Sequence, residues 1–214
     1  MTTNLKTRLV LACLGLALLA CAAPLLPAGD KKPDEKKGTE RPAPNYYPVQ
    51  EGAAWHFNVT ANGNEAKVVN RIAKIEKIDG VALGRLEAVV NDKIVATEHV
   101  SQTDKGVFRH RYNGAVIDPP LPLLRYPVKA GDKWEGDLKV GADAGKYDCV
   151  ASEEEVAVPA GKFKALKVVI NVAEKGNTLS TTYWFVNNVG FVRQTVEAGN
   201  LNILMELERH EAKK

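Results

Sequence analysis

The chain has 214 residues, of which 45% are hydrophobic and 26% are charged, and its formal net charge is +3 at pH 7. This apolar content is enough to build a globular core. The near-neutral charge gives no electrostatic reason to bind nucleic acid or an acidic surface, so we expect no nucleic-acid partner.

The first 20 residues have the three zones of an export signal. Lys6 and Arg8 precede an apolar run over residues 9–20, and small residues follow on either side of Cys21. The apolar run is shorter than the roughly 20 residues that a membrane-spanning helix needs. We therefore expect residues 1–20 to be a signal peptide that is removed on export.

The cleavage site decides whether the exported protein is tethered. Leu18-Leu19-Ala20-Cys21 resembles the bacterial lipoprotein box, in which the cysteine becomes the lipidated first residue. This predicts lipidation of Cys21 and a lipoprotein on the periplasmic face of a bacterial membrane, which it contacts through its N-terminal lipid anchor alone. Ala20-Cys21-Ala22 also fits the small-x-small pattern of an ordinary signal peptidase. Cleavage before Ala23 would leave a soluble secreted or periplasmic protein.

Composition divides the rest of the chain into two parts. Residues 21–45 combine charges of both signs with proline and glycine and contain few large apolar residues, which predicts a disordered charged tether. Residues 46–214 have the length of a single domain. Cys149 is the one cysteine in that domain, so an internal disulfide is excluded there.

Turn pairs recur between short apolar segments of this domain and supply the positive φ angles of tight hairpins. Between them, apolar residues often alternate, as at Leu166, Val168, Ile170 and Val172. We therefore expect an all-β, mainly antiparallel fold: a strongly curved sheet, either an open half-barrel or barrel-like, built from consecutive hairpins. The turn pairs include Asn62-Gly63, Asp79-Gly80, Asn91-Asp92, Asn113-Gly114, Gly176-Asn177 and Gly199-Asn200.

Two segments depart from this pattern. The apolar residues over 68–78 have a spacing that also suits a helix, but Asp79-Gly80 favours a strand that continues into a hairpin, with a bulge near Ala73. Residues 118–127 contain four prolines, which predicts an apolar loop. That loop either caps the core or forms the lip of a hydrophobic cleft. For the second case the candidate ligand-binding residues are Leu121, Leu123, Leu124, Tyr126, Tyr112 and Trp184.

Four motifs occur in order along the domain: Tyr47-Pro48 with Gly52 and Trp55, residues 126–134 (YPVKAGDKW), residues 158–165 (VPAGKFKA), and Tyr183-Trp184-Phe185 followed by residues 189–193 (VGFVR). The series resembles a widespread family of secreted bacterial proteins and lipoproteins of uncharacterised function. The resemblance implies a curved antiparallel sheet similar to the half-barrels of lipoprotein-sorting and lipid-carrier proteins. It implies no catalytic residue.

No catalytic pattern is evident in the sequence. The four histidines have no spacing typical of a metal site, and nucleophile elbows and phosphate loops are absent. We expect Arg109 and Arg111 to lie on a solvated strand face, with an anion-binding patch as the alternative, and Cys149 to be a small buried residue.

These observations favour a non-enzymatic, monomeric cell-envelope protein without a cofactor. Its concave sheet would bind a lipid or another hydrophobic small molecule. The alternative is a structural or assembly factor with a fully packed core that binds an envelope protein, and the third hypothesis is an unrecognised envelope enzyme.

Overall fold

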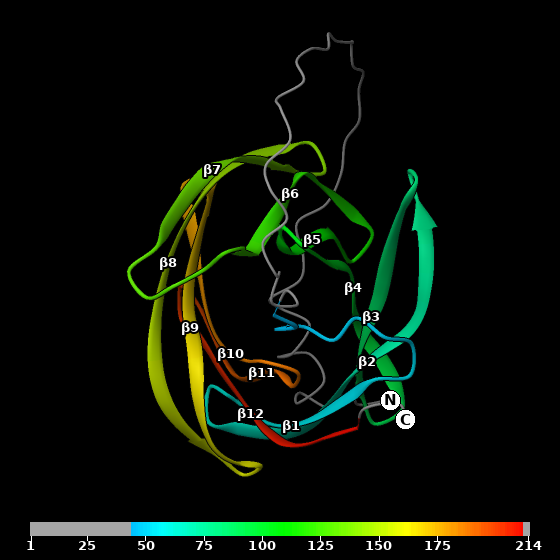
Figure 1. The fold of residues 1–214 in the computed structure, drawn as a ribbon, viewed down its shortest axis with the longest axis vertical. Coiled ribbons are helices and arrows are strands. Elements are labelled where there is room, and N and C mark those ends of the chain that lie inside the picture. The colour runs from blue at the N-terminus through cyan, green and yellow to red at the C-terminus, as the bar shows by residue number, and fades with distance from the viewer. Residues whose placement is uncertain (1–43, 212–214) are drawn as a thin grey trace, which may run out of the picture.

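The computed structural model describes residues 44–211. The predicted signal peptide, Cys21 and the predicted tether up to residue 43 lie outside the described residues. Those described form twelve antiparallel strands in one closed barrel (Figure 1). The strands are β1 Ala54–Ala61, β2 Asn64–Ile78, β3 Val81–Val90, β4 Lys93–Thr103, β5 Gly106–Tyr112, β6 Ala115–Arg125, β7 Lys133–Val140, β8 Asp143–Val158, β9 Gly161–Glu174, β10 Asn177–Val186, β11 Gly190–Ala198 and β12 Leu201–Glu211.

Each strand pairs with the next one along the chain, so the predicted series of consecutive hairpins is confirmed. The turn residues adopt the expected positive φ angles, such as 46° at Asn62 and 47° at Asn113. Pairing of β1 with β12, from Ala54↔Glu211 to Ala61↔Ile203, closes the sheet. Of the two predicted forms, the barrel is therefore the one observed, and the open half-barrel is not.

Residues 68–78, whose apolar spacing also suits a helix, are part of the 15-residue strand β2. Its pairing with β3 shifts register between Ile72 and Lys74, so the predicted bulge at Ala73 is confirmed. The bulge explains the mixed spacing, because one extra residue changes which later side chains point inward.

The centre of the barrel is filled by aromatic side chains and by residues 44–53, which precede β1. Phe57 and Phe191 stack with ring centroids 4.9 Å apart. Tyr47, which precedes β1, stacks on Trp55 at 5.7 Å and on Phe191 at 6.0 Å. The backbone N–H of Tyr47 donates to Oε1 of Gln102 at 2.7 Å. Residues 44–53 therefore act as a plug inside the ring of strands, shown in blue in Figure 1.

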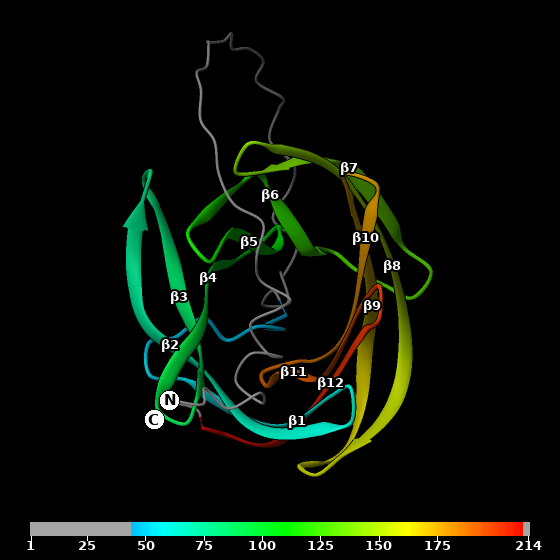
Figure 2. The same cartoon turned by 180° about the vertical axis from the view of Figure 1, so that it is seen from behind.

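The long β8–β9 hairpin turns back toward the last strand. The backbone N–H of Ala160, at its tip, donates to the carbonyl of Leu207 on β12 at 2.9 Å. Arg193 Nη2 on β11 donates to the carbonyl of Ala157 at 3.0 Å. Figure 2 shows this tip in yellow near β12. The tip of the hairpin thus contacts both β11 and β12.

The proline-rich segment corrects one prediction: residues 115–125 form the strand β6 and not a loop. β6 pairs with β5 along much of its length, including Leu121↔Arg109 and Pro122↔Phe108. Its pairing with β7 is limited to Ile117↔Val140 and Asp118↔Lys139. Prolines are tolerated here because the strand has no partner on that side after Asp118, so the missing N–H groups are not needed.

We call the unpaired stretch between residues 119–125 of β6 and 133–138 of β7 the seam. One side-chain hydrogen bond spans it, from the indole N–H of Trp134 to the carbonyl of Pro122 at 3.1 Å.

Over residues 44–211, we find no helix with the length and apolar content to cross a membrane.

Candidate functional site

A groove of about 400 Å³ lies beside the seam. Its volume is within the range of roughly 300–1,000 Å³ that is typical of small-molecule sites. Its walls come from β3, β4, β5, β6 and β8 and from the turn between β4 and β5. The lining residues are Val81, Ser101, Thr103, Lys105, Phe108, His110, Pro119, Pro120, Pro122, Arg125 and Tyr147.

Strand alternation explains why the groove has an apolar wall. Phe108 and His110 are two residues apart on β5 and so project to the same face. Pro122 lies directly opposite Phe108 in the β5–β6 pairing, which places its ring beside the phenyl group. β7 has separated from β6 at this level. Pro119 is exposed and Phe108 is half-buried, whereas Pro122 is buried.

The polar groups of the groove are held by hydrogen bonds. Ser101 Oγ and His110 Nε2 share a bond of 2.8 Å. Arg125 Nη2 donates to the hydroxyl of Tyr147 at 2.9 Å. Burial, followed by the nearby His99, lowers the pKa of His110 below its usual value of 6.5, so this imidazole is mainly neutral at pH 7. The groove's cations at neutral pH are therefore Lys105 and Arg125.

The six predicted ligand-binding residues are not brought together, and none of them lines this groove. Leu121, Leu123 and Leu124 are 4%, 2% and 0% exposed and belong to the core. Trp184 is also buried, and Lys167 and Arg193 lie over its ring at 5.2 and 5.6 Å. Their part in ligand binding stays a prediction.

The two tyrosines among the six lie near β5 and β6. Tyr112 ends β5, with the guanidinium of Arg109 5.7 Å from its ring centroid. Tyr126 follows β6 and packs on Tyr46 at 6.2 Å, and burial raises its pKa to about 12. The prediction thus named residues beside the groove-lining prolines and missed Pro119, Pro120, Pro122 and Arg125 themselves. The prolines were visible in the sequence, but the sequence alone did not show that β6 brings them to one groove.

A second polar cluster lies deeper, in the barrel core, where Arg109 Nε donates to Glu98 Oε2 at 2.7 Å. Arg109 Nη2 also donates to the hydroxyl of Tyr183 at 2.7 Å. Burial acts to lower the pKa of Arg109, but Glu98 together with Tyr183 and Tyr112 outweighs it, so the pKa is raised. The prediction that Arg109 lies on a solvated strand face is therefore wrong. The one feature of the sequence that could have indicated a buried Arg109 is Glu98 on the preceding strand, because its charge is opposite to that of Arg109.

This cluster surrounds a cavity of about 20 Å³, lined in part by Tyr47, Asn70 and Leu123. A space of this size holds one water molecule and no organic ligand. We therefore assign the cluster a structural role in the core.

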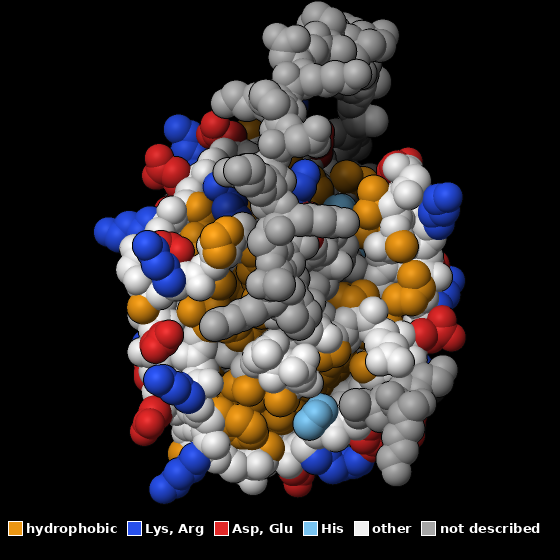
Figure 3. Space-filling model, viewed as in Figure 1, with side chains coloured by type: hydrophobic (Ala, Val, Ile, Leu, Met, Phe, Trp, Pro, Cys, Tyr) orange, Lys and Arg blue, Asp and Glu red, His pale blue; other side chains and the backbone are white. Residues whose placement is uncertain are grey.

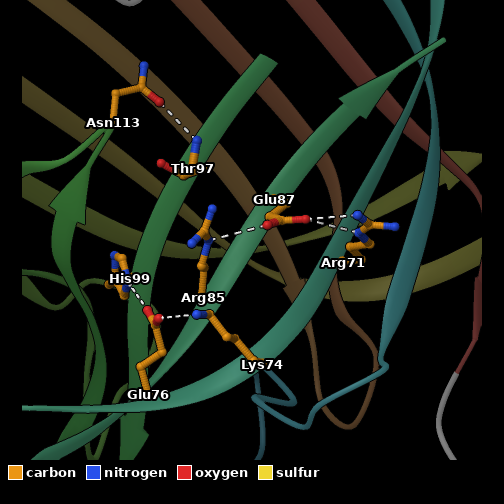
Figure 4. A network of polar contacts seen from close by, with 8 residues as sticks. All are labelled: Arg71, Lys74, Glu76, Arg85, Glu87, Thr97, His99 and Asn113. Carbon is orange, nitrogen blue, oxygen red and sulfur yellow. Dashed lines mark hydrogen bonds and ion pairs between the residues drawn. The ribbon is translucent and has the colours of Figure 1, made fainter. Parts of the chain in front are cut away.

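Charged residues on β2, β3 and β4 form a third network (Figure 4). Glu87, only 8% exposed, lies between Arg71 at 2.9 Å and Arg85 at 3.3 Å. Glu76 accepts from Lys74 and from His99, each at 2.6 Å, and these hydrogen bonds lower its pKa to about 2. Glu76 is thus ionised at neutral pH and cannot act as a general acid there.

Cys149 is the one cysteine among residues 44–211. The thiol of Cys149 is 1% exposed, and burial raises its pKa to about 12, so it stays protonated at neutral pH. The prediction of a small buried residue is confirmed at this position. Across residues 44–211 there is no cluster of three or more His, Cys, Asp or Glu side chains that could hold a metal ion.

No protein-family model and no curated protein matches the chain. Its structure is similar to that of a protein described as a lipoprotein from Parabacteroides distasonis, with 15% identity, a TM-score of 0.45, and coverage of 80% of this chain and 100% of the other. An exported protein with a YmcC-like fold from Bacteroides fragilis has 16% identity and a TM-score of 0.49, with coverage of 78% and 98%. The hypothetical lipoprotein YmcC from Escherichia coli has 11% identity and a TM-score of 0.34, with coverage of 78% and 87%.

All three are described as lipoproteins or exported proteins, the class that the sequence motifs resemble. With TM-scores below 0.5, none of these likenesses carries a functional conclusion for this chain.

Proposed function

We propose that the chain is an exported, non-enzymatic cell-envelope protein, anchored through a lipidated Cys21, that binds the apolar part of a lipid-like molecule. The observation that carries the proposal is the groove of about 400 Å³ with walls of Val81, Phe108 and prolines. The export signal and the cysteine that follows it support the location.

The groove, and not the barrel centre, is the place where such a ligand fits. Tyr47, Trp55, Phe57 and Phe191 stack inside the barrel, and the cavity beside them holds about 20 Å³. On the face of the molecule shown in Figure 3, apolar side chains lie toward the middle, and Lys, Arg, Asp and Glu side chains lie around the edge. Burying a methylene group contributes about 0.8 kcal/mol, so six of them supply on the order of 5 kcal/mol before the ordering costs of binding.

One observation favours a second candidate, hydrolysis of an acyl ester. Ser101 and His110 share a bond of 2.8 Å inside the groove, which is the spacing of a nucleophile and its base. However, Ser101 is 4% exposed, and no described carboxylate bonds to His110 to orient it. We therefore favour binding. An acyl-ester assay tests hydrolysis directly: turnover that Ser101→Ala abolishes would support the second candidate.

Binding is tested with Nile red, an uncharged apolar dye whose fluorescence increases in an apolar site. The dye should bind the protein at micromolar concentration. The variant Val81→Asp should weaken binding about fivefold or more, because it places a charge in the apolar wall. Val81 is 43% exposed, so this change should leave the fold intact.

Ile94→Asp is the matched control. Ile94 is 48% exposed near the start of β4, in a setting similar to that of Val81, but it does not line the groove. It should bind the dye as the unmodified protein does. No dye binding, or equal effects of the two substitutions, would refute the proposed site.

A further inference from the structure

The charges around the groove are of one sign. Lys105 and Arg125 are among its eleven lining residues, and no aspartate or glutamate is. Other cations of the barrel have carboxylate partners: Arg71 and Arg85 both pair with Glu87, and Lys74 pairs with Glu76. Neither Lys105 nor Arg125 forms an ion pair with any residue of the described range 44–211. A further group of cations, such as Lys93 and Lys133, forms no ion pair within residues 44–211, so it is the shared groove that sets Lys105 and Arg125 apart.

The backbone holds these two cations together. Arg125 at the end of β6 pairs with Gly106, the residue after Lys105. The backbone N–H of Tyr126, the residue after Arg125, donates to the carbonyl of Lys105 at 2.9 Å. The strand end and the turn therefore lie side by side, and their cationic side chains line the same groove.

The Arg125 guanidinium is also oriented. Its Nη2 donates to the hydroxyl of Tyr147, a side chain that is 5% exposed. Tyr147 fits closely against Gly136 on β7, where an added Cβ would lie 2.8 Å from the Tyr147 hydroxyl oxygen. A guanidinium has five N–H donors, so this bond fixes its direction and leaves others for a ligand.

We propose that the groove selects a single-chain amphiphile with an anionic oxygen headgroup, whose carboxylate or phosphate oxygens bind Arg125 and Lys105 while its chain lies against Phe108 and the prolines of β6. This inference rests on the proposed function. A planar guanidinium group binds two oxygens of a carboxylate or phosphate at once. The apolar side chains that would contact the ligand's chain line the same groove as the two cations.

The test is displacement of Nile red from the exported Cys21→Ser protein, which keeps the predicted tether and the barrel without the predicted anchor. Competitors with the same chain length are laurate, lauroyl lysophosphatidic acid, dodecanol and dodecylamine. The two anions should displace the dye at about tenfold lower concentration than the alcohol or the amine, since hydrogen bonds to charged groups are stronger than those between neutral groups. A preference for one of the two anions identifies the headgroup.

Arg125→Gln should remove most of the preference for anions, because Lys105 is then the one cation left in the groove lining. Arg111→Gln on β5 is the matched control, because Arg111 does not line the groove. Should Arg125→Gln lower the melting temperature, Lys105→Gln on the exposed turn gives a second measurement, with a smaller expected loss of preference.

The outcomes separate this inference from the function on which it rests. Dye binding with equal displacement by laurate and dodecanol overturns the anionic headgroup and leaves the apolar groove in place. A preference for anions that survives both Arg125→Gln and Lys105→Gln also overturns the assignment of the headgroup to these two cations. Absence of dye binding refutes the proposed function itself.

Discussion

The ion pair of Glu98 and Arg109 is largely buried in the barrel core. The two side chains are only 18% and 16% exposed, and the guanidinium bonds to Tyr183 as well as to the carboxylate. Removal of water from a charge is costly unless a partner compensates, so each residue depends on the other.

Glu98→Leu should therefore lower the free energy of unfolding by about 3 kcal/mol or more, because it leaves the Arg109 charge buried without a counterion. The double variant Glu98→Leu/Arg109→Leu should recover part of that loss, since it removes both charges. Urea denaturation measures both values. A single variant as stable as the unmodified protein would show that water reaches the guanidinium.

Glu76 offers a prediction about pH. Hydrogen bonds from Lys74 and His99 lower its pKa from 4.5 to about 2 in the folded protein. A carboxyl group with a depressed folded pKa stabilises the fold above its unfolded pKa, and this stabilisation is lost as the pH falls from about 4.5 to about 2.

His99→Gln removes the imidazole that donates to Glu76. The pKa of Glu76 should then rise toward 4.5, as followed by carbon NMR of its carboxyl group. The loss of stability on acidification should begin at a higher pH than in the unmodified protein. An unchanged titration would mean that Lys74 alone sets the pKa.

At the scale of elements, β6 is the strand that turn and alternation patterns did not reveal. Its prolines argue against a paired strand, and only the absence of a partner on the β7 side after Asp118 removes that objection. Whether β7 pairs with β6 depends on the tertiary structure and cannot be inferred from the sequence of β6. The bulge in β2 could be predicted because its cause, a change in apolar spacing before a hairpin turn, lies within one segment.

Leu121 and Leu123 test the assignment of β6 to the core. Both are almost fully buried, so changing both to serine should lower the free energy of unfolding by about 1.5 to 3 kcal/mol for each residue. Val116→Ser on the same strand is the control, because Val116 is 45% exposed and should change stability by about 0.5 kcal/mol or less. Denaturant titration measures all variants. Equal small effects would place the leucines at a solvated cleft.

At the scale of the whole molecule, the sequence indicated the fold class, left open whether the sheet closes into a barrel, and did not indicate the groove. Closure depends on β1 pairing with β12, whose partners Ala54 and Glu211 lie at opposite ends of the described chain. No local pattern reports such a contact. The groove also depends on contacts between distant parts of the chain. Its lining residues, from Val81 to Tyr147, are brought together by the order of the strands, and the groove lies where β6 and β7 do not pair. Arg109 was misplaced because alternation groups side chains by face without saying which face a closed barrel encloses.

The proposed anchor can be tested independently of the groove. If Cys21 carries the lipid, Cys21→Ser should move the protein from the membrane fraction to the soluble fraction, because each acyl methylene in the bilayer contributes about 0.8 kcal/mol to attachment. Cys13→Ser is the matched control and should stay with the membrane, since Cys13 lies inside the apolar run of the signal. Cell fractionation with mass spectrometry of the mature N-terminus gives the answer.

A wild-type protein that is soluble and begins at Ala23 would contradict the anchor, because an ordinary signal peptidase would then have removed Cys21. The groove would in that case meet its ligand in solution, where free amphiphiles are dilute. Anchoring at Cys21 instead keeps the barrel close to a membrane, within reach of the molecules that an apolar groove with two unpaired cations is suited to bind. Fractionation therefore decides whether the groove takes its ligand from a membrane surface or from the surrounding fluid.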